Sequence, residues 1–191
     1  MQGHPHHGQD ASDDVARLET EINRFSKAIH ENPRDAKAYF GRGVLFGQLG
    51  DAERAVEDFT TTLRLDPKSG EAYYNRGIAR IHLKQHILAI DDFTDTIALD
   101  PQHVDAYNNR ASANYEMGRP REVIADAQRV IGINPRHPGA YALRALGHIM
   151  LGEETEAQAD AKKATELGFD PRTVQGLLQR ERQSKQQNQK G

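Results

Sequence analysis

The chain has 191 residues, of which 37% are hydrophobic and only 6% aromatic, a composition that favours thin layers of helices over a thick globular core. It has no Cys, which excludes disulfides, thiolate metal sites and a cysteine nucleophile, and its formal net charge of −3 gives no reason to expect a nucleic acid as partner. No run of 18 apolar residues occurs and the first ten residues do not resemble a secretory signal, so we expect no membrane insertion and take the cytoplasm only as the default compartment.

The N-terminal region divides into a tail and one amphipathic helix. Residues 1–10 show no apolar periodicity, and we expect a disordered tail there. From 11 to 35, apolar residues recur every three or four positions, which predicts a helix closed by Asn32-Pro33. These residues are Val15, Leu18, Ile22, Phe25 and Ile29. The apolar face of this helix either packs on the helices that follow or pairs with the same helix of a second chain to make a homodimer.

A six-residue motif occurs four times in the middle of the chain. AYFGRG begins at Ala38, and AYYNRG, AYNNRA and AYALRA follow at intervals of 34 residues. A fixed period of this length is typical of a solenoid, in which helix pairs stack and bury their apolar faces against their neighbours. The repeats are placed at 36–69, 70–103, 104–137 and 138–171.

Turn signals divide each repeat into two antiparallel helices. A glycine follows the first helix at Gly50, Gly118 and Gly152, where left-handed backbone is needed. Asp-Pro or Asn-Pro follows the second helix in the first three repeats, because the residue before a proline is pushed out of the helical region. The first repeat also carries Tyr39, Gly43, Ala55, Phe59 and Pro67, and the second carries Tyr73, Gly77, Ala89, Phe93 and Pro101 at the same spacing.

This pattern resembles the tetratricopeptide repeat (TPR) over residues 36–171, and residues 11–35 resemble a half repeat that caps the N-terminus. The resemblance implies an all-α fold, a right-handed α-solenoid of antiparallel helix pairs known as the TPR superhelix. After the fourth repeat, we expect a C-terminal capping helix over 172–182 with an apolar stripe that covers the last repeat. Residues 183–191 have no apolar side chain and are expected to be a disordered polar tail.

An arginine and an aspartate keep the same period. The arginines are Arg42, Arg76, Arg110 and Arg144, and the aspartates are Asp58, Asp92, Asp126 and Asp160. In an antiparallel pair, the middle of the first helix lies beside the middle of the second, so we expect each arginine to pair with the aspartate of its own repeat. Neighbouring repeats offer a second geometry, such as Arg76 with Asp58. Either way, a charge in a mostly apolar layer needs a partner, and we interpret these ion pairs as structural.

The resemblance also implies a binding surface, because in the TPR family the first helices line a concave groove that holds a peptide or a partner's helix. The residues expected on that groove are Phe40, Val44, Tyr74, Asn75, Ile78, His82, Asn108, Asn109, Ser112 and Tyr115. Aromatic and amide side chains there favour a peptide whose backbone is held by Asn and whose side chains enter apolar pockets. Alternatively, Phe40, Tyr74 and Ile78 pack between repeats.

One mode of binding known in the family is not expected. Chaperone-binding members clamp a terminal carboxylate with Lys and Asn from one repeat, Asn from the next, and Lys and Arg from the third. The corresponding positions in this chain are Phe40, Val44, Asn75, Asp105 and Asn109, of which only Asn75 matches. Without the cations, an anionic terminus has no partner.

Neither a metal site nor a catalytic site is expected. His82 and His86 have the i, i+4 spacing of zinc ligands on a helix, but Lys84 stands where other repeats have the turn glycine, so the turn falls between them. No nucleophile elbow or phosphate-binding glycine loop occurs. The sequence therefore predicts a non-catalytic scaffold or adaptor for a protein or peptide, with no cofactor. The alternative is a regulatory or recruiting segment of a larger enzyme or envelope assembly.

Overall fold

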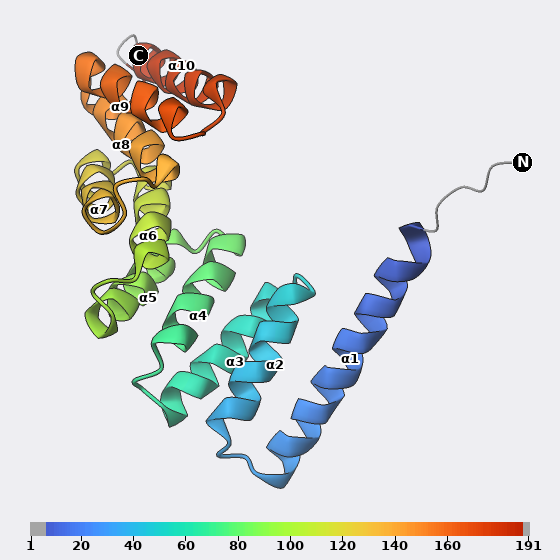
Figure 1. Ribbon diagram of the computed structural model, residues 1–191. Helices are drawn as coiled ribbons and strands as arrows, with labels where there is room; N and C mark the ends of the chain where they lie inside the picture. The colour runs from blue at the N-terminus through green and yellow to red at the C-terminus, as the bar shows by residue number, and fades with distance from the viewer. Residues whose placement is uncertain (1–6, 189–191) are drawn as a thin grey trace, which may run out of the picture. The chain divides into compact units, whose positions relative to one another are not determined.

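The computed structural model describes residues 7–188, which form ten helices and no strand (Figure 1). The helices are α1 (His7–Glu31), α2 (Ala36–Gln48), α3 (Ala52–Leu65), α4 (Gly70–His82), α5 (His86–Leu99), α6 (Val104–Glu116), α7 (Pro120–Ile133), α8 (Pro138–Leu151), α9 (Glu154–Glu166) and α10 (Pro171–Asn188). From α2 to α9, each 34-residue period holds two helices, as the turn signals predict. Within the described residues, no helix combines the length and apolarity that crossing a membrane requires.

The first helix of every repeat begins at a side-chain cap that itself keeps the period. The cap accepts a hydrogen bond from the backbone N–H three residues later, which satisfies one of the unpaired donors at the helix start. The caps are Asp35, Ser69, His103 and His137, the last two accepting through Nδ1.

Left-handed backbone ends the first helices at the predicted positions. The φ angles of Gly50, Gly118 and Gly152 are 78°, 66° and 87°. Lys84 takes the same conformation with a φ of 58°, although it carries a Cβ. The turn between α4 and α5 therefore separates His82 from His86, as predicted, and the two residues do not share a helix.

Two expectations about the chain ends need correction. Residues 7–10 are helical because α1 begins at His7, and residues 183–188 are helical because α10 continues to Asn188. Residues 1–6 and 189–191 lie outside the described residues. Residues 179–188 have no apolar side chain, but Gln, Arg, Glu and Lys have good helix propensity and extend a helix that is already nucleated. Low apolar content alone therefore did not indicate disorder.

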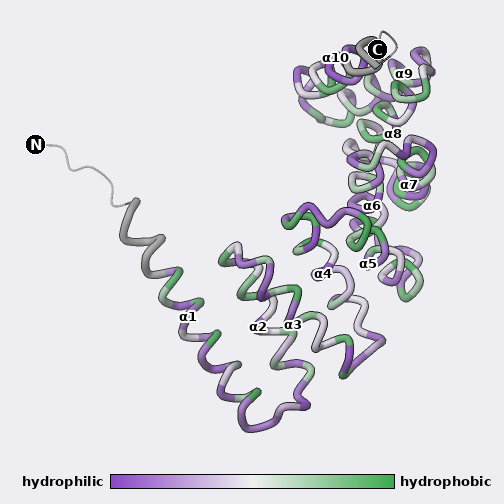
Figure 2. The backbone as a smooth tube through the Cα atoms, turned by 180° about the vertical axis from the view of Figure 1, so that it is seen from behind, coloured by the Kyte–Doolittle hydropathy of each residue, from purple (hydrophilic) through white to green (hydrophobic). Residues whose placement is uncertain are grey.

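The chain divides into two compact units, of which the first, Met1–Gln85, contains α1 to α4. In this unit α2 packs against both α1 and α3, and α3 packs against α4. Its core contains Phe46, Ala55, Phe59 and Ala79, with Ile22 of α1 packed against it. Figure 2 shows both hydrophobic and hydrophilic residues along the helices of this unit, and the buried residues of α3, such as Ala55, Phe59 and Leu63, recur every three or four positions, as expected of a helix with one buried face.

Small residues allow the helices of the first unit to approach closely. A Cβ added at Gly41 would lie 2.5 Å from Cζ of Phe25 in α1, and one added at Gly43 would lie 2.9 Å from Cε1 of Phe59 in α3. The apolar face of α1 thus packs on α2 through Phe25. Val15, nearer the N-terminus of α1, is 44% exposed.

The second unit, His86–Gly191, contains α5 to α10. One core cluster joins Tyr107, Val130 and Ala140 of α6, α7 and α8. A larger cluster joins α8 and α9 to α10, which contributes Val174 and Leu178. The apolar side of α8 is therefore covered by α10.

Candidate partner-binding site

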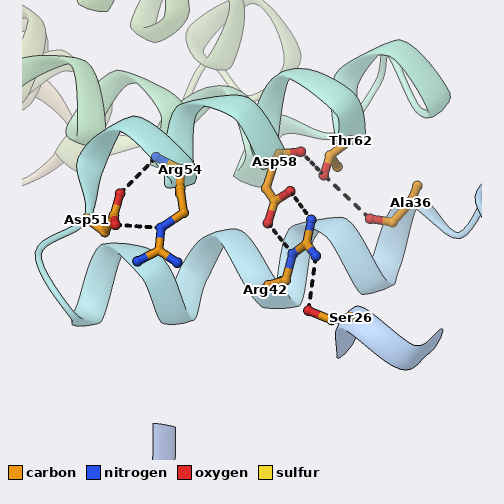
Figure 3. A network of polar contacts seen from close by, with 7 residues as sticks. All are labelled: Ser26, Ala36, Arg42, Asp51, Arg54, Asp58 and Thr62. Carbon is orange, nitrogen blue, oxygen red and sulfur yellow. Dashed lines mark hydrogen bonds and ion pairs between the residues drawn. The ribbon is translucent and has the colours of Figure 1, made fainter. Parts of the chain in front are cut away.

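Bidentate ion pairs hold the first helix of a repeat to the second. Arg42 donates from Nε and Nη2 to the two carboxylate oxygens of Asp58, both at 2.8 Å (Figure 3). Arg110 and Arg144 form the same pair of bonds with Asp126 and Asp160, at 2.7–2.9 Å. Arg76 and Asp92 lie in different units, so their pairing stays a prediction.

Three of these arginines, Arg42, Arg76 and Arg110, also reach back to the preceding helix, a contact that the sequence did not predict. Nη1 of Arg42 donates to the Ser26 hydroxyl at 3.0 Å, and Nη1 of Arg110 donates to Thr94 at 2.9 Å. Nη1 of Arg76 donates to Thr60 at 3.2 Å. The guanidinium groups also stack on the tyrosines three residues earlier, at 5.5–5.8 Å from the ring centroids.

These contacts explain the charge within the layer of helices. The hydrogen bonds to Asp58 raise the pKa of Arg42, and those to Asp126 and Asp160 raise the pKa of Arg110 and Arg144. A guanidinium whose donors are used within the protein positions helices and is a poor candidate for partner recognition.

An open cleft of about 380 Å³ lies in the first unit between α2 and α4. Its apolar wall includes Val44, Phe59 and Ile78, and its polar groups are the side chains of Gln48, Asn75 and His82. The remaining lining residues are Gly47, Gly50, Ala52 and Ala79. Asn75 Nδ2 donates to the carbonyl oxygen of Glu71 at 2.8 Å, which orients its amide. The cleft thus joins an apolar wall with groups that can bond a peptide backbone.

Four of the predicted groove residues, Val44, Asn75, Ile78 and His82, meet in this cleft. Phe40 and Tyr74 are half-buried in the same unit. Phe40 packs on Phe59 with the ring centroids 5.7 Å apart, which agrees with the alternative that it fills the space between helices.

The other four predicted groove residues belong to α6 in the second unit. Asn109 is half-buried, and Ser112 Oγ donates to the carbonyl oxygen of Asn108 at 3.1 Å. The Tyr115 hydroxyl donates to Glu181 of α10 at 2.9 Å. Tyr115 is therefore in contact with the C-terminal helix, so this part of the predicted groove surface is covered from within the chain.

Comparison with known proteins identifies the repeat. Models described as tetratricopeptide repeat match residues 22–57, 45–103 and 104–137. The chain belongs to the tetratricopeptide repeat family. The predicted TPR family and the all-α solenoid class are thereby confirmed. No curated protein matches the chain.

Solved TPR structures share the fold. A crystal structure of MamA has a TM-score of 0.78 and 26% sequence identity, and the alignment covers 86% of this chain and 96% of that one. YrrB, a TPR protein with an unusual peptide-binding site, has a TM-score of 0.79 and 20% identity, covering 87% and 86%. MamA from Desulfovibrio magneticus RS-1, from residue 41 to the end, has a TM-score of 0.75 and 21% identity, and the alignment covers 83% of this chain and 92% of that one. The family and these neighbours support a protein-interaction scaffold.

Gly47 was not among the residues predicted for the TPR groove. Gly47 lies in the last turn of α2 and lines the cleft, and nothing lies within 4 Å of a Cβ added to it. The sequence signal that could have found it is the departure from the period, because the same position carries Ile81, Tyr115 and Ile149 in the other repeats.

Proposed function

We propose that the TPR chain binds a peptide segment of a partner protein in the cleft between α2 and α4. The observation that carries the proposal is that one open cleft of about 380 Å³ is lined both by apolar Val44, Phe59 and Ile78 and by the amide of Asn75. Peptide and ligand clefts of roughly 300–1,000 Å³ typically combine an apolar wall with a few polar groups.

The charge of the cleft favours an internal, uncharged segment. No Lys or Arg is among the residues that line it, and His82 is its one titratable residue. A terminal carboxylate would find no cation there, which supports a mode of binding different from the carboxylate clamp of chaperone-binding members. YrrB, which shares the fold, offers a precedent for peptide binding by a TPR protein.

The test starts from a random peptide library selected against the full chain. Fluorescence anisotropy then measures the dissociation constants of the selected peptides for the wild type and for the variants Asn75→Ala and Ile78→Ser. We expect each variant to weaken binding by about tenfold or more, because loss of a buried anchor or hydrogen bond costs over about 1 kcal/mol. Asn23→Ala, the same amide deletion on the exposed face of α1, is the matched control and should leave binding unchanged.

The effect of the two cleft variants on peptide affinity decides whether the cleft is the binding site. Peptides that bind the wild type and lose affinity in both cleft variants support the proposal. Peptides that bind all variants equally move the binding surface away from the cleft. A selection that returns no binding peptide also counts against it.

A further inference from the structure

The position of Gly47 within its repeat has a large side chain in every other repeat. Residues 34, 68 and 102 positions later are Ile81, Tyr115 and Ile149. Repeat 1 is therefore the one repeat in which this position lacks a side chain. A periodic position that is filled in three copies and vacant in one indicates a local change of role rather than a change of fold.

The second unit shows where the side chain at this position goes. Tyr115 of α6 packs against the cluster that contains Leu146 and Ile149 of α8, the next first helix. Ile149 is itself only 2% exposed and joins Val174 and Leu178 of α10. The position thus fills the space between one first helix and the next.

In α2 the same space is open. A Cβ at Gly41 or Gly43 would clash with Phe25 or Phe59, so those two glycines are explained by packing within the chain. A Cβ at Gly47 would meet nothing within 4 Å, although α4 follows as the next first helix. The cleft lies at this point, with Val44, Ile78 and Ala79 around it.

We propose that this vacant position receives a large apolar side chain of the partner, of the size of Tyr or Ile. The partner's side chain takes the place that Tyr115 fills in repeat 3. This inference rests on the proposed function and names its anchor: an uncharged segment with one bulky aliphatic or aromatic residue, flanked by backbone that reaches Asn75 and Gln48. Burying such a side chain removes a large apolar surface from water, and buried aromatic or aliphatic side chains of this kind act as the main anchors of an interface.

The decisive variant supplies the missing side chain from within the chain. Gly47→Tyr and Gly47→Ile restore what the other repeats have and should fill the cleft. Gly132→Tyr is the matched control, because Gly132 is also helical and also has nothing within 4 Å of an added Cβ, but it lies in α7 and does not line the cleft. Gly47→Ala adds only a methyl group and keeps the test valid if the larger variants do not fold.

Binding is measured by NMR titration with three small ligands, N-acetyltyrosinamide, N-acetylisoleucinamide and N-acetylglycinamide. We expect the first two to shift the amide signals of Val44, Ile78 and Ala79 with half-saturation on the order of millimolar, and the glycine amide to shift none. In Gly47→Tyr and Gly47→Ile the shifts should disappear. They should be weakened in Gly47→Ala and unchanged in Gly132→Tyr.

Selected peptides give the second readout. Those that bind the cleft should carry a bulky apolar residue and lose at least tenfold in affinity for Gly47→Tyr. If selected peptides depend on Asn75 but bind Gly47→Tyr as tightly as the wild type, or if the tyrosine and glycine amides behave alike, the anchor is overturned while the proposed function stands. If no peptide depends on Asn75 or Ile78, both are overturned.

Discussion

Arg42 and Asp58 are joined by two parallel hydrogen bonds of 2.8 Å, and only 6% of the Asp58 side chain is exposed. The pair links α2 to α3, and Nη1 of Arg42 continues the link to Ser26 of α1. One guanidinium therefore connects three successive helices, which explains why the period retains a charge in a layer that is otherwise apolar.

Replacing only Arg42 should destabilise the first unit more than replacing Arg42 and Asp58 together. Arg42→Met strands the Asp58 carboxylate and should lower the free energy of unfolding by about 3–5 kcal/mol, whereas the double change with Asp58→Leu leaves no buried charge and should cost much less. Urea denaturation measures both. Arg24→Met is the control: its side chain is 77% exposed and pairs with Glu21, so its loss should cost under about 1 kcal/mol. Equal midpoints for the single and double variants would contradict this account.

The helix pairs could be predicted from the sequence because the period repeats the same turn chemistry. Gly50 and Asp66-Pro67 mark the ends of two helices, and the same signals recur too regularly for chance. The caps His103 and His137 were missed, since histidine is not among the preferred capping residues. The extension of α10 to Asn188 was missed because its last residues are helical through their helix propensity, which apolar periodicity does not reveal.

The candidate site was only partly predictable, and the reason is the same period. Tyr74 and Asn109 were placed on the groove by analogy between repeats and stay predictions, whereas Gly47, which lines the cleft, departs from the period. The covering of Tyr115 by Glu181 depends on a contact between residues far apart in the sequence, which no local pattern reveals.

Gly41 should be intolerant of any side chain. In Gly41→Ala the new methyl group would meet the Phe25 ring, whose nearest atoms lie 2.5–2.9 Å away, so α1 would have to move off α2. We expect a loss of about 1–3 kcal/mol and faster hydrogen exchange of the α1 amides. Adding Phe25→Leu should recover part of the loss by making room. Gly47 also lies in α2, but nothing lies within 4 Å of a Cβ added there, so Gly47→Ala should instead raise the free energy of unfolding by about 0.5–1 kcal/mol.

Lys84→Gly should stabilise the chain. Lys84 has a φ of 58°, a conformation that costs a residue with a Cβ roughly 1–2 kcal/mol, and glycine removes most of that cost. Thermal denaturation should show a higher midpoint for this variant. Lys37→Gly, the same replacement within α2, should lower the midpoint, because there glycine only loosens a regular helix. A lower midpoint for Lys84→Gly would show that the lysine side chain stabilises this turn in another way.

Tyr115 should ionise only at a pH well above the ordinary range of tyrosine. Burial, followed by its hydrogen bond to Glu181, raises the pKa of Tyr115 from its ordinary value of 10.0 to about 12. Because the pKa is higher in the folded chain, the neutral phenol stabilises the fold below about pH 10, and this contribution is lost as the pH rises toward about 12. The difference in phenolate absorbance between the wild type and Tyr115→Phe should therefore appear near pH 12.

Glu181→Gln separates the two causes of this shift. It removes the carboxylate that accepts the hydrogen bond but leaves Tyr115 buried, so the difference titration should move to lower pH while staying above the ordinary value of 10.0. Glu57→Gln, an exposed change in the first unit, should leave the titration unchanged. If Tyr115 ionises at its ordinary pKa in the wild type, then α10 does not cover it in solution, and the surface of α6 would be open to a partner after all.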